Sequence, residues 1–232
     1  GDVTTNAAVM AEEGNIEVTA QGDVTTNAAV TAEAGNIEVT AQGDVTTGGE
    51  LSATEGTITL TSEGGDIAVG NEAMAQGNVA LYAEAGSVAI NGALTSIDEN
   101  VVVTAEDAVT ITANIEANQD VTLTSESAGI TQTATAGIQA QTVTTASAEG
   151  VDLQGIGNQF GTITVQSSDE NVGIQGSVLV HDSADKLVLS VQPVVNGDIT
   201  VENSKPQGML QVSSDLHAVG YGEETDGDIT LK

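Results

Sequence analysis

The sequence contains no cysteine, arginine or tryptophan, and it has only three lysines and three other aromatic residues. Disulfides and thiolate metal centres are therefore excluded. The 34 acidic residues set a formal net charge of −31, so the chain repels nucleic acid and cannot attach to an anionic membrane through a basic patch. High charge with few aromatic residues is typical of disorder, but the order of the residues contradicts that interpretation.

An internal repeat runs through the whole chain. Segments 1–21 and 22–42 are identical at 19 of 21 positions, and segment 43–63 keeps the frame with altered side chains. One apolar-x-apolar pair per repeat continues the frame through the degenerate segment 64–232. Eleven such pairs, one of them with the polar Thr145 in its second position, lie between Ile16 and Leu231, and the steps from one pair to the next stay close to the length of segment 1–21. The pairs are Ile16/Val18, Ile37/Val39, Ile58/Leu60, Val79/Leu81, Val101/Val103, Val121/Leu123, Val143/Thr145, Ile163/Val165, Leu187/Leu189, Leu210/Val212 and Ile229/Leu231.

Each repeat is typical of β-structure. Segments such as IEVTA, ITLTS and VTLTS alternate apolar and polar residues and are rich in Val, Ile and Thr. Gly-Asn and Gly-Asp turns recur every five to eight residues, which leaves about three short strands per repeat. Because such a unit cannot bury its apolar face alone, successive repeats must stack. We therefore predict an all-β fold, a right-handed parallel β-helix of about eleven coils.

Residues 1–232 are expected to form a single β-helix domain, without a linker. At about 4.8 Å per coil the rod is roughly 50 Å long. No sequence typical of a cap is found at either end, and Gly1 begins inside a repeat. Either the chain is a segment of a longer protein, or it is a processed subunit that stacks end to end with its own copies into a filament.

The repeat frame GDVTTNAAVTAEAGNIEVTAQGDVTT resembles the β-helical repeats of filamentous haemagglutinin-like exoproteins, the passengers of two-partner secretion. The segment GNQFGTITV, residues 157–165, is similar to an N-x-F-G segment of large surface proteins of that kind. This resemblance covers the whole chain. It implies a right-handed β-helix, export to the bacterial cell surface, and an adhesive or fibre-forming role without catalysis.

Three acidic clusters are candidates for cation binding, because Ca²⁺ prefers six to eight oxygen ligands. Two lie around Asp98 and Glu99 and around Asp169 and Glu170, and we expect both to be solvated turns. The third provides the candidate calcium site, since three carboxylates fall within five residues: Glu224, Asp226 and Asp228. None of the clusters matches a known calcium-loop pattern.

The two histidines each have an aspartate nearby, as in His181–Asp182 and Asp215–His217. A His–Asp pair can serve as a general base or a metal ligand, but exposed loop residues are the simpler interpretation. Phe160, the only phenylalanine, is expected to fill the core or plug a turn and not to bind a ligand. Stacked amides are expected where asparagines recur one period apart, at Asn6/Asn27 and Asn15/Asn36.

The sequence thus predicts an extracellular structural or adhesive protein, a rigid acidic stalk or fibre segment of a bacterial surface protein, and no enzyme. Its partners would be its own copies, or glycans and proteins on host or neighbouring cells, without nucleic acid or membrane insertion. Two alternatives stay open: a β-helix that binds or cleaves carbohydrate, and a calcium-dependent assembly module. Spread along the rod, the net charge of −31 amounts to about one charge per 1.7 Å, so cations should promote association.

Overall fold

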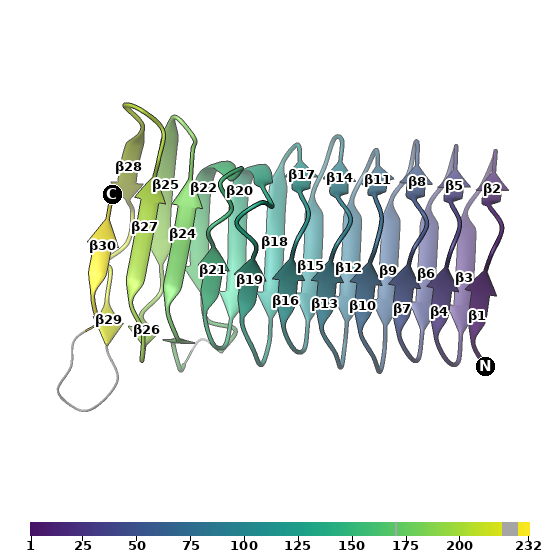
Figure 1. The fold of residues 1–232 in the computed structure, drawn as a ribbon, viewed down its shortest axis with the longest axis horizontal. Coiled ribbons are helices and arrows are strands. Elements are labelled where there is room, and N and C mark those ends of the chain that lie inside the picture. The colour runs from purple at the N-terminus through teal and green to yellow at the C-terminus, as the bar shows by residue number, and fades with distance from the viewer. Residues whose placement is uncertain (170, 220–226) are drawn as a thin grey trace.

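The computed structural model of the protein describes residues 1–169, 171–219 and 227–232. Parallel strands stacked in a solenoid form this part of the chain, and it contains no helix. Figure 1 shows the strands side by side along the long axis, with the N-terminal coil at one end and the C-terminal coil at the other. The predicted all-β parallel solenoid is confirmed, and one sequence repeat makes one coil, since Val3 lies beside Val24 and Ile16 beside Ile37.

Three sheets surround the regular N-terminal coils, because each of these coils contributes one strand to each sheet. The first sheet has eleven strands: β1 (Val3–Thr5), β4 (Val24–Thr26), β7 (Val45–Thr47), β10 (Ile67–Val69), β13 (Val88–Ile90), β16 (Val109–Ile111), β19 (Ile130–Gln132), β21 (Val151–Leu153), β24 (Val178–Asp182), β27 (Ile199–Asn203) and β30 (Ile229–Leu231). Ten full turns therefore separate its first strand from its last.

The second sheet is narrow and is formed by β2 (Val9–Ala11), β5 (Val30–Ala32), β8 (Leu51–Ala53), β11 (Ala73–Ala75), β14 (Leu94–Ser96) and β17 (Ile115–Ala117). The third, called the wide sheet below, is formed by β3 (Ile16–Ala20), β6 (Ile37–Ala41), β9 (Ile58–Ser62), β12 (Val79–Ala83), β15 (Val101–Ala105), β18 (Asp120–Ser125), β20 (Ile138–Ser147), β22 (Gln159–Gln166), β25 (Lys186–Val191) and β28 (Met209–Val212).

Strand β20 joins the narrow and wide sheets. Its first residues, Ile138 and Gln139, pair with β17, and residues 142–147 pair with β18. Beyond it, a short fourth sheet of β23 (Ile174–Gln175), β26 (Val194–Val195) and β29 (Ala218–Val219) adds a side to the last coils. The C-terminal coils therefore have a different cross-section from the regular N-terminal ones.

One apolar core fills the rod from end to end. Strands of the wide sheet alternate buried and partly exposed residues, as in β9 and β15, so the inward Val, Ile and Leu side chains form continuous columns. The predicted pairs from Ile16/Val18 to Ile163/Val165 occupy these columns in register. Burial of apolar surface along this column stabilises the stack.

Near the C-terminus, two of the predicted apolar pairs do not lie beside the residues that the repeat frame assigned to them. Ile163 lies beside Leu189 and Val165 beside Val191, so the expected pair Leu187/Leu189 is offset by two residues. A two-residue slip keeps the same side chains facing inward, and an alternating pattern therefore cannot detect it. Ile229 and Leu231 pair with Ile199 and Val201 in the first sheet and not with Leu210 and Val212 in the wide sheet.

Candidate functional site

A ladder of aspartates lies along the turn before the first sheet. The Oδ1 atom of Asp23 accepts a hydrogen bond from the backbone N–H of Asp44 at 2.9 Å, and Asp44 accepts one from Asp66 at 2.9 Å. Asp66 in turn accepts one from Ser87 at 2.7 Å. Each carboxylate thus satisfies a backbone donor of the next coil, while like charges stack one coil apart along the rod.

The candidate calcium site is described only in part. Glu224 and Asp226 lie outside the described residues. Asp228 is exposed, and its backbone N–H donates to the carboxylate of Asp198 at 2.9 Å, in the same ladder geometry as near the N-terminus. Among residues 1–169, 171–219 and 227–232, no group of three His, Asp or Glu side chains is arranged to hold a metal ion. The calcium site stays a prediction.

Asparagine ladders stack along other turns, as predicted. Nδ2 of Asn27 donates to Oδ1 of Asn6 at 2.8 Å, and Oδ1 of Asn15 accepts from the backbone N–H of Asn36 at 3.0 Å. These bonds satisfy turn groups that would otherwise lack partners, so their role is structural.

His181 and Asp182 do not form a pair. They are successive residues of β24, so their side chains point to opposite sides of the strand. The His181 ring nitrogen lies 3.2 Å from the carbonyl of Gly155, while Asp182 is fully buried. The expectation of exposed loop residues is therefore wrong for both, because His181 is half-buried and both residues belong to a strand. Both Asp215 and His217 are exposed, as expected.

The Asp182 carboxylate joins strands by accepting backbone hydrogen bonds. Its Oδ1 accepts from Phe160 at 2.9 Å and its Oδ2 from Ala184 at 2.8 Å. Burial raises the pKa of Asp182, and the backbone N–H donors oppose that shift. Phe160 fills the core, as predicted.

A buried amide pair, which sequence reasoning missed, lies next to this carboxylate. Gln132 and Asn158 exchange two hydrogen bonds of 2.8 and 2.9 Å, and Asn158 also donates to the carbonyl of His181 at 3.0 Å. The N-x-F-G segment at Asn158–Gly161 contributes both Asn158 and Phe160. The motif therefore supplies one buried polar and one buried apolar side chain to the core, in the coils where the cross-section changes.

The other acidic clusters lie in turns, as expected. Asp98 accepts a hydrogen bond from the Gln76 side chain, and Asp169 accepts one from the backbone N–H of Asn171 at 2.9 Å. Asp98, Glu99 and Asp169 lie at the surface, and Glu170 is outside the described residues. Among the described residues, none of them belongs to a group of three His, Asp or Glu side chains that could hold a metal ion.

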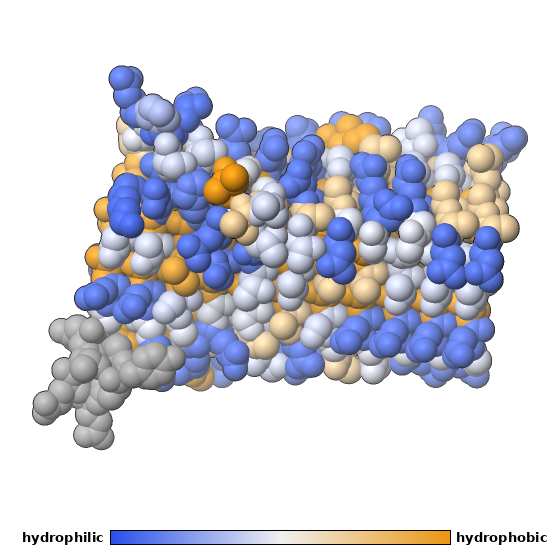
Figure 2. Space-filling model, in the orientation of Figure 1, coloured by the Kyte–Doolittle hydropathy of each residue, from blue (hydrophilic) through white to orange (hydrophobic). Residues whose placement is uncertain are grey.

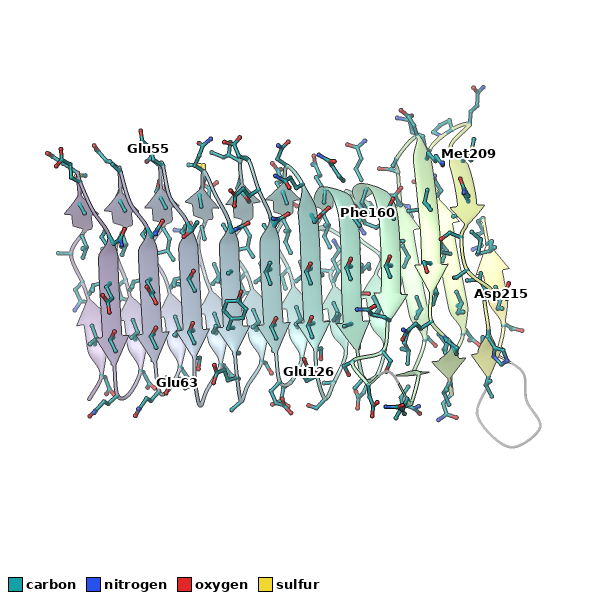
Figure 3. All side chains as sticks on the ribbon, turned by 180° about the vertical axis from the view of Figure 1, so that it is seen from behind. Glu55, Glu63, Glu126, Phe160, Met209 and Asp215 are labelled. Atoms are coloured by element: carbon teal, nitrogen blue, oxygen red, sulfur yellow. The ribbon has the colours of Figure 1, made fainter. Side chains whose placement is uncertain are left out.

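The wide sheet carries a surface without charge, here called the uncharged face. It consists of the two central outward side chains on each of seven strands: Thr59, Thr61, Ala80, Tyr82, Val102, Thr104, Thr122, Thr124, Thr144, Ala146, Thr164, Gln166, Val188 and Ser190. In Figure 3, where this sheet faces the viewer, Glu55, Glu63 and Glu126 lie along its two borders. Sequence reasoning missed this face, because each strand taken alone is unexceptional.

Comparison with protein-family models, curated proteins and solved structures found no match for this chain. Within the described residues, no helix has the length and apolar character needed to cross a membrane. A function for this chain therefore has to be inferred from the geometry and the charge of the rod itself.

Proposed function

We propose that this chain is a rigid acidic segment of a stalk or fibre, an adhesive structural part of a secreted bacterial surface protein. The repeats support a place in the filamentous haemagglutinin-like class of two-partner-secretion passengers. The observation that carries the proposal is the continuous apolar core from the first coil to the last. Such a core makes the stack of coils a stiff rod. We infer a structural role and no catalysis.

Both ends of the rod favour further stacking. Val18 of the first coil is half-buried, whereas its partner Val39 in the second coil is fully buried. At the other end Ile229 and Leu231 are each 43% exposed, whereas Ile199 beside them is fully buried. Apolar cross-sections edged by unpaired strand backbone are suited to receive another coil, from the same polypeptide or from a second copy.

The charge pattern favours contact at the ends over contact along the sides. Rows of hydrophilic side chains run along the rod in Figure 2, and the aspartate ladder stacks like charges one coil apart. Parallel rods should repel each other at low salt, and cations should reduce that repulsion. Cation-dependent association follows from charge screening and needs no dedicated calcium site.

The end-stacking proposal can be tested with two neighbouring residues of β3. Val18→Glu places a charge in the end cross-section, whereas the control Thr19→Glu places the same charge on the outward side of the same strand. Sedimentation velocity and negative-stain electron microscopy at rising protein concentration should show growth in length for the wild type and Thr19→Glu. Val18→Glu should abolish that growth. Compact particles, or growth in width, would contradict the proposal.

A further inference from the structure

The uncharged face departs from the rest of this surface. The chain has 34 acidic residues, and the outward positions of β3 and β6 include Glu17 and Glu38. From β9 to β25 the central outward positions hold only neutral side chains, chiefly threonine. Removing water from such a face costs less free energy than removing it from the acidic borders. It is the part of the rod best suited to contact a neutral ligand.

A hollow lies on this face around Tyr82. It has a volume of about 470 Å³ and spans β9, β12, β15 and β18. The hollow exists because the outward side chain before Tyr82 is the small Ala80, between Thr59 and Val102 on the adjacent strands. Among the described residues, Tyr82 is the only exposed aromatic side chain, since Phe160 is buried. Its ring adds a flat apolar surface with a polar hydroxyl.

Hydrogen-bonding groups form one rim of the hollow. Oδ1 of Asn78 accepts from the backbone N–H of Asn100 at 3.0 Å, and Oδ1 of Asn100 accepts from that of Asp120 at 3.1 Å. The hydrogen bonds of the described residues leave Nδ2 of Asn78 and the carboxylate of Asp120 unpaired, although both line the hollow. Donors and acceptors held in place by a ladder are already oriented, so less entropy is lost when a ligand binds.

We propose that this hollow binds a neutral pyranose unit of a glycan. The C–H face of the sugar stacks on Tyr82, while Asn78 donates to a sugar hydroxyl and Asp120 accepts from one. A few placed polar groups beside an apolar surface are the usual composition of a small-ligand site. The inference deepens the proposed adhesive function, which it assumes, by naming the ligand class that the rod would contact.

The same charges define what the site rejects. No lysine lies near the hollow, since Lys186, Lys205 and Lys232 are all in the last coils. The Asp120 carboxylate and the net charge of −31 repel uronic acids and sulfated sugars. The ligand is therefore a neutral hexose or N-acetylhexosamine polymer and not an acidic one.

Isothermal titration calorimetry tests the site with four probes: cellohexaose, maltohexaose, chitohexaose and laminarihexaose, with polygalacturonate as the anionic comparison. We expect at least one neutral probe to bind and polygalacturonate to give no signal. Tyr82→Ala should weaken binding at least tenfold, and Tyr82→Phe, which keeps the ring, should stay within about threefold of the wild type. Met74→Ala, in the same coil on the narrow sheet, serves as the control and should leave binding unchanged.

Three results would overturn the proposal. They are the absence of binding by every neutral probe at millimolar concentration, equal binding by the wild type and Tyr82→Ala, and a doubled mass in solution that Tyr82→Glu returns to the monomer. The last result would assign the face to a second copy of the chain. Circular dichroism must show that each variant keeps the β-sheet spectrum. Failure here leaves end stacking untouched, because the Val18→Glu experiment probes a different surface.

Discussion

The glycine two residues before the apolar pair provides a graded test of coil stacking. Gly56, Gly77 and Gly161 all occupy this position, two residues before Ile58, Val79 and Ile163. A Cβ atom added to Gly56 would lie 2.1 Å from the carbonyl oxygen of Gly35. On Gly77 it would meet the Thr57 methyl at 3.0 Å, and on Gly161 only the Gln141 carbonyl at 3.3 Å.

The cost follows from how far the coils must separate. A carbon and a carbonyl oxygen need about 3.3 Å, so Gly56→Ala requires a shift of more than about 1 Å. Strand spacing is set by the ladder of hydrogen bonds, including the 2.9 Å bond from Gly77 N–H to Gly56 C=O. Overpacking costs about 1–3 kcal/mol and a lost hydrogen bond about 1 kcal/mol, so we expect Gly56→Ala to destabilise by about 2–4 kcal/mol.

Milder effects are expected at the other two positions. The Thr57 side chain can rotate, so Gly77→Ala should cost about 1 kcal/mol. For Gly161→Ala, the reduced entropy of the unfolded chain offsets the small contact, and the change should stay within about 1 kcal/mol. Guanidinium unfolding followed by circular dichroism measures all three. Equal effects, or Gly161→Ala as the most destabilising change, would refute the stacking geometry.

Three further predictions concern polar groups of the rod. The Thr47 hydroxyl is buried without a hydrogen-bond partner, so Thr47→Val should raise the free energy of unfolding by about 1 kcal/mol. The control Thr46→Val changes an exposed residue of the same strand and should alter that free energy little. Thermal unfolding measures both variants. Asp44→Asn keeps an acceptor for the Asp66 N–H while removing one charge from the ladder. At about 10 mM NaCl the melting temperature of Asp44→Asn should be higher than that of the wild type, and at about 0.5 M NaCl this difference should be smaller, because salt screens the repulsion between the stacked carboxylates. A difference that grows with salt would contradict the idea that these carboxylates repel each other. Burial raises the pKa of Asp182 above 3.8, so the folded chain binds this proton more tightly than the unfolded chain does. Protonation of Asp182 therefore stabilises the fold at low pH, and this contribution to the free energy of unfolding is lost as pH rises through the raised pKa. Asp182→Asn places an NH₂ group against the Ala184 N–H, which should cost about 1–3 kcal/mol, and the wild type's advantage in urea unfolding should be larger at pH 4 than at pH 7.

The regular part of the fold could be predicted because two periods agree. Alternation within IEVTA and ITLTS defines the inward side, and the longer repeat places those sides in one column. The longer period alone did not identify the last coil. Residues 227–230 read GDIT, as do residues 197–200, and this match would have placed Ile229 in the first sheet beside Ile199.

The features missed all depend on contacts between distant residues. Gln132 and Asn158 are far apart in the sequence, and neither is recognisable as buried from its neighbours. The two-residue slip at Leu189 preserves the inward pattern, so only strand pairing reveals it. The hollow around Tyr82 needs four strands in register. Such properties arise from stacking and not from any single repeat.

The coils stack in one continuous, evenly spaced column along the first sheet. The absence of cysteine lets spin labels be attached at introduced cysteines without background. Thr25, Thr110 and Thr200 face outward on β4, β16 and β27 of the first sheet, and β16 and β27 lie four and eight strands from β4. At about 4.8 Å per strand, the backbones are roughly 19 Å apart for Thr25→Cys/Thr110→Cys and roughly 38 Å apart for Thr25→Cys/Thr200→Cys. Pulsed electron paramagnetic resonance measures the distance between the two spin labels, which should follow these separations. Label-to-label distances that fail to double from the first pair to the second would contradict this even stacking of the coils.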